Sequence, residues 1–221
     1  MSEPLSLRGR FVHLLPMRMA HVDDLVAAAT EERSTFAYTA VPSDTAAMAA
    51  YVTNALAARD AGQQYPFVTY GVEVGRIVGT TRFYEIQQWD WSAVPVDDRA
   101  DRHDHDRHDH DQHGNRLDTL HIGHTWLSPA AQRTPVNTEA KLLMLAHAFD
   151  VWGVRAVRIQ TDARNNRSRR AIERLGCHLD GVLRAERPAT DGTVRDTATF
   201  SMLASEWPTN RQRLEARLTS A

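Results

Sequence analysis

The run Leu120-His-Ile-Gly-His-Thr-Trp-Leu-Ser-Pro129 decides the fold, together with Ala130-Ala-Gln-Arg-Thr-Pro-Val-Asn137 and Thr138-Glu-Ala-Lys-Leu-Leu-Met-Leu-Ala-His-Ala-Phe149. The first run predicts a buried strand, the second a short loop, and the third a helix that begins at or near Asn137, which can cap it. Such a helix points its unpaired N–H groups and the positive end of its dipole at whatever lies in front of it. The segment therefore predicts a site for an anionic ligand.

The hydrophobic periodicity of the rest of the chain predicts one α/β domain over residues 1–221, with a mixed sheet flanked by helices. Strands are expected over 11–15, 65–75, 77–86, 156–161, 177–183 and 197–203. Helices are expected over 21–32, after a cap at 43–44, over 162–175 and over 206–218.

The composition excludes several classes of protein. A formal net charge of −2 gives no electrostatic reason to expect nucleic acid or an anionic membrane as a partner. No apolar run is long enough to span a membrane, and the first residues lack the apolar core of a secretion signal. One cysteine, Cys177, excludes an intramolecular disulfide framework and fits a reducing compartment. We therefore expect a cytoplasmic protein.

An insert over about 97–118 alternates histidine with aspartate and has no apolar periodicity. Such a segment cannot bury enough surface to offset its ordering entropy, so we interpret it as a long solvated loop between two strands. The histidines also suggest a divalent metal site. Because alternation alone fixes no coordination geometry, we do not expect a physiological metal site.

A second informative run, Asn165-Asn-Arg-Ser-Arg-Arg-Ala-Ile-Glu-Arg-Leu-Gly176, opens the helix after the strand that ends near Thr161. With the run Ile122 to Pro129 leading into Thr138-Glu-Ala-Lys141, it resembles the GNAT superfamily of acetyl-CoA-dependent N-acetyltransferases. Within that superfamily it is most similar to the branch of ribosomal-protein N-terminal acetyltransferases. The resemblance implies a single GNAT-like domain whose mostly antiparallel sheet splays at the cofactor site.

The resemblance also implies where acetyl-CoA binds. The pantetheine arm would bond like an added strand to the backbone of the central strand, the pyrophosphate would lie on the loop after it, and Asn165 would bond the arm. The implied cofactor-binding residues are Thr125, Trp126, Leu127, Gln132, Arg133, Thr134, Val136, Asn137, Thr138 and Asn165. This loop departs from the family pattern, because Pro135 and Asn137 stand where glycines are usual and Pro135 has no N–H.

Acetyl transfer to an amine requires a base or a water chain for the ammonium proton and a group that stabilises the leaving thiolate. The resemblance places Ser168 near the thioester sulfur, although a serine there also suits a helix cap. His121 is the candidate base, and a structural histidine is the equal alternative. Strict alternation along the strand would place His121 and His124 on opposite faces, so that only one of them faces the substrate.

Two functions follow from these residues. The first is an acetyl-CoA-dependent N-acetyltransferase acting on a primary amine, either a protein N-terminal α-amine or a small molecule, as a monomer or a homodimer. The second is a non-catalytic acyl-CoA-binding module whose histidine-rich loop senses or binds a metal. Glu139, in the first turn of its helix, is expected to complement the helix dipole.

Overall fold

The computed structural model describes residues 4–90 and 117–220, so the predicted loop over 97–118 lies outside the described residues except for its last two positions. The strands are β1 Leu7–Arg8, β2 Val12–Pro16, β3 Tyr65–Gly71, β4 Arg76–Gln87, β5 Thr119–Leu127, β6 Ala156–Asp162, β7 His178–Pro188 and β8 Val194–Leu203. The helices are α1 Val22–Thr30, α2 Thr45–Asp60, α3 Pro135–Ala146, α4 Asn166–Glu173 and α5 Trp207–Thr219, with a π-helical turn His147–Val151 after α3.

The described strands form one open sheet in the order β1-β2-β3-β4-β5-β6-β8-β7. Neighbouring strands are antiparallel except β5 and β6, which are parallel. The prediction of a mixed, mostly antiparallel sheet flanked by helices is therefore confirmed. The short strand β1 was not predicted, and β7 and β8 are longer than the sequence pattern indicated.

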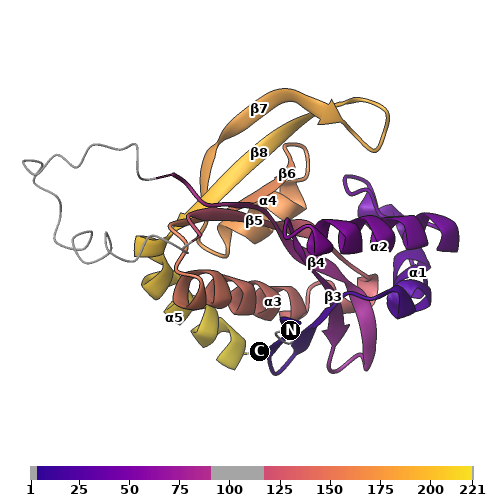
Figure 1. The fold of residues 1–221 in the computed structure, drawn as a ribbon, viewed down its shortest axis with the longest axis horizontal. Coiled ribbons are helices and arrows are strands. Elements are labelled where there is room, and N and C mark those ends of the chain that lie inside the picture. Colours follow the sequence, from indigo (N-terminus) through magenta and orange to yellow (C-terminus); the bar gives the residue numbers. More distant parts are fainter. Residues whose placement is uncertain (1–3, 91–116, 221) are drawn as a thin grey trace, which may run out of the picture.

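Helices cover both faces of the sheet (Figure 1). Helices α1 and α2 pack on one face around Leu25, Met48 and Val52, and the opposite face carries α3, α4 and α5 around Met144, Ile172 and Leu214. Each face thus buries its own apolar cluster, and the central strands β4 and β5 lie between the two layers of helices.

The ends of the helices follow local chemistry. Asp44 caps α2 by accepting the N–H of Ala47 at 2.8 Å. Helix α3 begins at Pro135 and not at Asn137, because the hydroxyl of Thr134 caps it by accepting the N–H of Val136. The prediction that Asn137 caps this helix is therefore wrong. Proline at the first helical position costs little, since the N–H that it lacks would have no partner inside the helix.

Glu139 does more than complement the dipole of α3. Its buried carboxylate accepts the backbone N–H groups of Arg10, Phe11 and Val12 at 2.8, 2.6 and 2.8 Å. A side chain at Gly9 would collide with this carboxylate, as an ideal Cβ there would lie 2.3 Å from its Cδ. Glu139 therefore ties the start of α3 to the turn before β2.

Among the helices in the described part of the chain, none has the length and apolar character needed to cross a membrane.

Candidate functional site

The sheet opens between β5 and β6. These two strands pair only from Thr119 to His121, opposite Ala156 to Arg158. Beyond that point β5 continues along β4, whereas β6 continues along β8. The backbone of β5 from Ile122 to Leu127 is therefore free of its neighbour on this side, which is the splay that the family resemblance implies.

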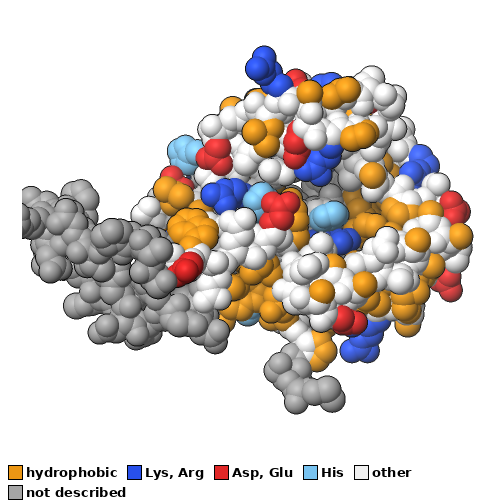
Figure 2. Space-filling view, turned by 45° about the horizontal axis from the view of Figure 1, so that its top comes forward, with side chains coloured by type: hydrophobic (Ala, Val, Ile, Leu, Met, Phe, Trp, Pro, Cys, Tyr) orange, Lys and Arg blue, Asp and Glu red, His pale blue; other side chains and the backbone are white. Residues whose placement is uncertain are grey.

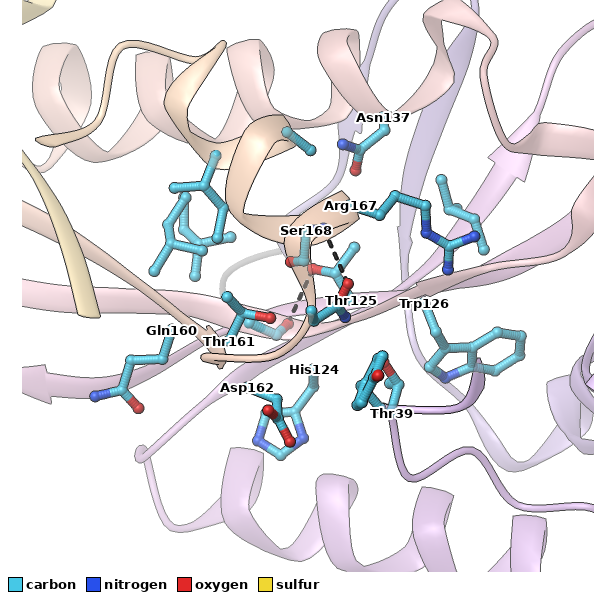
Figure 3. A pocket seen from close by; sticks show the side chains of 18 of the residues that line it. Thr39, His124, Thr125, Trp126, Asn137, Gln160, Thr161, Asp162, Arg167 and Ser168 are labelled. Carbon is cyan, nitrogen blue, oxygen red and sulfur yellow. Dashed lines mark hydrogen bonds between the residues drawn. The ribbon is translucent and has the colours of Figure 1, made fainter. Parts of the chain in front are cut away.

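A cavity of about 820 Å³ fills this opening and passes from one face of the sheet to the other. Figure 3 shows Asn137, Arg167 and Ser168 on the side of α3 and α4, and Thr39, His124 and Asp162 on the side of α2. One continuous space therefore connects the N-terminus of α3 with the opposite layer of helices.

Positive charge dominates the wall of this cavity. Seven of the described lining residues are Arg or Lys, and one, Asp162, is acidic. Asp162 is already paired with Arg164, with 2.8 Å between Oδ2 and Nη2, and this contact lowers the pKa of the carboxyl group. The cavity is thus suited to a ligand that carries several negative charges.

The loop between β5 and α3 forms the end of the cavity that is suited to bind an anion. Gln132 joins two walls of the cavity, because its Nε2 donates to the carbonyl of Leu127 at 2.8 Å and its Oε1 accepts from Arg167 Nη1 at 3.0 Å. Arg133 adopts a φ of 62°, which turns the loop sharply before the helix. Arg133 of the loop and Arg167 of α4 therefore line the cavity together with the first turn of α3, which carries the positive end of the helix dipole.

The structure brings most of the predicted cofactor-binding residues to this cavity. Nine of them line it: Thr125, Trp126, Leu127, Gln132, Arg133, Thr134, Asn137, Thr138 and Asn165. Val136 is the exception, since its side chain is buried in the core and its N–H already donates to Thr134 Oγ1 at 3.3 Å.

The second motif places Ser168 on the cavity wall in the first turn of α4. Asn165, not Ser168, caps this helix, because its Oδ1 accepts the N–H of Ser168 at 3.0 Å. The amide nitrogen of Asn165 therefore points away from the cap, and the hydroxyl of Ser168 is not needed for it.

The two histidines of β5 do not lie on opposite faces. Both rings pack edge-on against Tyr84, with centroids 5.2 Å from it for His121 and 5.1 Å for His124. The cause is a β-bulge, in which His124 and Thr125 together oppose Thr81 of β4 and His124 takes a φ of 48°. The alternation predicted from the sequence is therefore wrong beyond Gly123.

His124 lines the cavity, whereas His121 is not among the described lining residues. The pKa of His124 is lowered to about 4, first by burial and then by the charges of Arg82 and Arg187, so its imidazole is neutral at pH 7. His121 is buried behind Tyr84, and its Nε2 lies 3.2 Å from Glu85 Oε2. Burial lowers the pKa of His121, and Glu85 opposes that shift.

Lys141 is a functional candidate to which the sequence reasoning assigned no role. It lies on the buried face of α3 with 4% of its surface exposed, and it lines the cavity. Its Nζ donates to Thr125 Oγ1 at 2.7 Å and to Thr81 Oγ1 at 3.0 Å. The signal was present, since Lys141 stands three residues before Met144 and four before Leu145, on the inward stripe of the helix.

Aromatic side chains line the cavity on the side of α2. Tyr51 and Tyr84 come from α2 and β4, and Tyr38 comes from the segment between α1 and α2. In the space-filling view the surface is hollowed between the β7–β8 hairpin and helices α1 and α2, and a histidine and Lys or Arg side chains lie in this hollow (Figure 2). The cavity is therefore reached from the surface on this side.

No metal-binding group of three or more His, Cys, Asp or Glu side chains occurs within residues 4–90 and 117–220. The histidine-rich run lies outside these ranges, so the prediction about metal there remains a prediction.

Comparison with known proteins gives a family and several similar structures. Residues 12–178 match the model of the acetyltransferase (GNAT) domain. No curated protein matches the sequence.

Three solved structures illustrate the likeness. A GCN5-related N-acetyltransferase from Brucella melitensis is 28% identical, with 97% of this chain and 86% of that chain covered and a TM-score of 0.73. The microcin C7 self-immunity acetyltransferase MccE, in complex with acetyl-CoA and AMP, is 16% identical over 88% and 93% of the chains, with a TM-score of 0.67. RimL, the ribosomal L7/L12 α-N-protein acetyltransferase in complex with coenzyme A, is 12% identical over 90% and 98%, with a TM-score of 0.67. The last two likenesses concern the fold alone.

Proposed function

Because the chain belongs to the GNAT acetyltransferase family and is thus an acyltransferase, we propose that it moves an acetyl group from acetyl-CoA to a primary amine by direct attack in a ternary complex. The observation that carries this proposal is the single cavity that joins the N-terminus of α3, through the parted strands, to the aromatic hollow beside α2. A coenzyme can enter from one face of the sheet and an amine from the other, so that the two meet at the opening.

The coenzyme would bind along the α3 side of the cavity. Its pantetheine arm would bond to the backbone of β5 at 125–127, on the side that has parted from β6, as an added strand does at a sheet edge. Its pyrophosphate would lie on the loop 132–138, where the helix dipole and the guanidinium groups of Arg133 and Arg167 favour negative charge. The structures of MccE with acetyl-CoA and of RimL with coenzyme A support such a ligand in this fold.

Pro135 does not argue against coenzyme binding. It occupies the first position of α3, where it removes one N–H, and the N–H of Val136 is used by the cap, but that of Asn137 has no partner inside the helix. Asn165 retains its amide nitrogen as a donor for the arm, because only its oxygen is used in the helix cap.

In the reaction, the nitrogen of the amine attacks the thioester carbonyl, a C–N bond forms and the C–S bond breaks. The thiolate leaves and takes up a proton, so that amine and acetyl-CoA yield amide and coenzyme A. Ser168 is proposed to donate a hydrogen bond to the thiolate sulfur as it leaves, since its hydroxyl lies on the wall of the cavity.

The amine side of the reaction involves the two histidines differently. The neutral imidazole of His124 faces the cavity and is suited to accept a hydrogen bond from the amine and orient it. Its low pKa makes it a weak proton acceptor at pH 7. His121 remains the proposed base, and because it lies behind Tyr84, a water molecule has to connect it with the amine.

The acceptor is proposed as a primary amine, either a protein N-terminus or a small molecule. RimL acts on a protein N-terminus, as its name states, and MccE was solved with AMP beside acetyl-CoA. The open hollow beside Tyr38 and Tyr51 leaves room for either class.

The test combines binding and turnover. Calorimetry with coenzyme A and with acetyl-CoA measures binding, and release of free thiol with a panel of peptides, polyamines and amino acids measures turnover. We expect binding, and thiol release with at least one amine class whose mass rises by one acetyl group. Binding without turnover on any acceptor would favour the non-catalytic module, and failure to bind either coenzyme form would exclude both functions.

A further inference from the structure

Lys141 is placed where an ordinary helix of this kind has an apolar side chain. It projects from α3 toward β4 and β5 among Met144, Leu145 and other core residues, and 4% of its surface is exposed. Burying an ammonium group without a carboxylate partner is unfavourable, and replacing buried charges by apolar groups of similar volume is often neutral or stabilising. Packing therefore gives no reason for a lysine at this position.

The polar groups around its Nζ are two hydroxyls that also bond to each other. Nζ donates to Thr125 Oγ1 at 2.7 Å and to Thr81 Oγ1 at 3.0 Å, and the two threonine oxygens are 2.8 Å apart. No carboxylate of the described residues is among the groups that shift the pKa of Lys141, which burial lowers to about 7. In its charged form the amine has a third hydrogen to donate.

The position of this group within the cavity suggests what receives that hydrogen. Lys141 and Thr125 both line the cavity, and Thr125 belongs to the part of β5 that has separated from β6. Asn137, four residues before Lys141 on α3, lines the end of the cavity that is suited to bind an anion. Four residues of an α-helix advance about 6 Å along its axis. The wall of the cavity therefore extends from the loop before α3 to the ammonium group of Lys141.

We propose that Lys141 is a coenzyme-binding residue, whose Nζ, held by Thr81 and Thr125, donates a hydrogen bond to a carbonyl oxygen of the pantetheine arm. This inference rests on the proposed function, because it requires acetyl-CoA in the cavity. The carbonyl belongs either to an amide of the arm or to the thioester at its end, and binding of coenzyme A, which lacks the thioester, separates the two.

The experiment compares the wild-type protein with Lys141→Met and Lys141→Gln. Methionine keeps the length of the side chain without a donor, and glutamine keeps a neutral donor on a shorter chain. Met144→Leu is the matched control, because Met144 is also fully buried on α3 and contacts Thr81 but is not among the described lining residues. Dissociation constants for coenzyme A and acetyl-CoA, KM, kcat and thermal midpoints are measured for all four proteins.

We expect Lys141→Met to weaken coenzyme binding by roughly 10- to 100-fold, the usual range for a hydrogen bond from a charged donor, while its thermal midpoint stays unchanged or rises. Lys141→Gln should lose less affinity, and Met144→Leu should bind as the wild type does. Equal losses for coenzyme A and acetyl-CoA would identify an amide of the arm, and a loss confined to acetyl-CoA and kcat would identify the thioester.

Three results would overturn the inference in distinguishable ways. If the wild type binds coenzyme A and Lys141→Met binds both forms within twofold of it with unchanged kcat, Lys141 has no role in coenzyme binding and the proposed function stands. If the wild type binds neither form, the proposed function fails and the inference fails with it. A parallel loss of affinity and of thermal stability in Lys141→Met would assign the lysine a structural role instead.

Discussion

Replacement of Lys141 by methionine should remove a rise in the free energy of unfolding that the wild type shows between pH 6 and pH 8.5. Burial lowers the pKa of Lys141 from 10.5 to about 7. Below pH 7 the lysine is protonated in the folded and the unfolded chain, and the folded chain bears the full cost of a buried unpaired charge. As the pH rises above 7 the folded chain releases this proton before the unfolded chain does, so stability increases with pH.

The size of the effect follows from the same two values. A pKa near 7 instead of 10.5 corresponds to roughly 5 kcal/mol between the charged and the neutral state, as an upper bound. Between pH 6 and pH 8.5 the wild type should recover roughly 2 kcal/mol of this cost. Lys141→Met lacks the titration, so its stability advantage over the wild type should be largest at pH 6 and smaller by roughly that amount at pH 8.5.

Urea unfolding of both proteins at pH 6, 7, 8 and 8.5 measures this difference. Other groups titrate as well: the pKa values of His121, His124 and His147 are lowered, and those of Tyr84 and Cys177 are raised to about 12. Comparison with the variant cancels their contribution, because both proteins contain them. An advantage that does not change with pH, or a variant less stable than the wild type at pH 6, would show that the charge of Lys141 carries no such cost in the folded chain.

Three further predictions concern neighbouring features. Glu139→Gln should lower the free energy of unfolding, measured in urea, by roughly 2–4 kcal/mol, because three backbone N–H groups lose a charged acceptor. Coenzyme affinity should stay near that of the wild type. A loss of stability below about 0.5 kcal/mol would contradict this account. Gly79→Ala should lower the free energy of unfolding by roughly 2–4 kcal/mol. Gly79 has a φ of 156°, and an ideal Cβ there would lie 1.9 Å from the carbonyl oxygen of Trp126. Thermal unfolding that matches the wild type would argue against this expectation. His124→Gln should raise the KM of the amine about tenfold without changing coenzyme affinity, because His124 lines the cavity where the amine is proposed to bind. An unchanged KM would remove His124 from the acceptor site.

The sequence predicted the fold well where periodicity and end signals agree. The strand at Leu120 follows an apolar run, and α2 begins after the predicted cap Asp44, so local and tertiary preferences point the same way there. The helix predicted over 162–175 is present but begins later, at Asn166, after the cap Asn165. The strands β7 and β8 were predicted too short, because their outer halves form an exposed hairpin in which neither face is fully buried and alternation is weak.

The candidate site was harder to predict, for two physical reasons. The bulge at His124 adds one residue to β5, and a bulge exchanges the faces of every later side chain without leaving a signature in the apolar pattern. Lys141 was overlooked because a helix prediction interprets a lysine within an apolar run as a solvent-facing residue. In both cases the residue that breaks the local rule lies on the wall of the cavity.

Two buried charged side chains on α3, Glu139 and Lys141, stand two residues apart and differ in how completely their partners satisfy them. The carboxylate of Glu139 receives three backbone N–H groups from the turn before β2 and the first residue of that strand. The ammonium group of Lys141 meets two hydroxyls and an open cavity. A buried charge whose hydrogen-bond partners all come from the fold contributes to the stability of the fold. A buried charge with a partner missing destabilises the fold until a ligand supplies that partner. Substitution should therefore act with opposite signs: removing the charge of Glu139 lowers stability and spares coenzyme binding, and removing that of Lys141 spares or raises stability and weakens coenzyme binding.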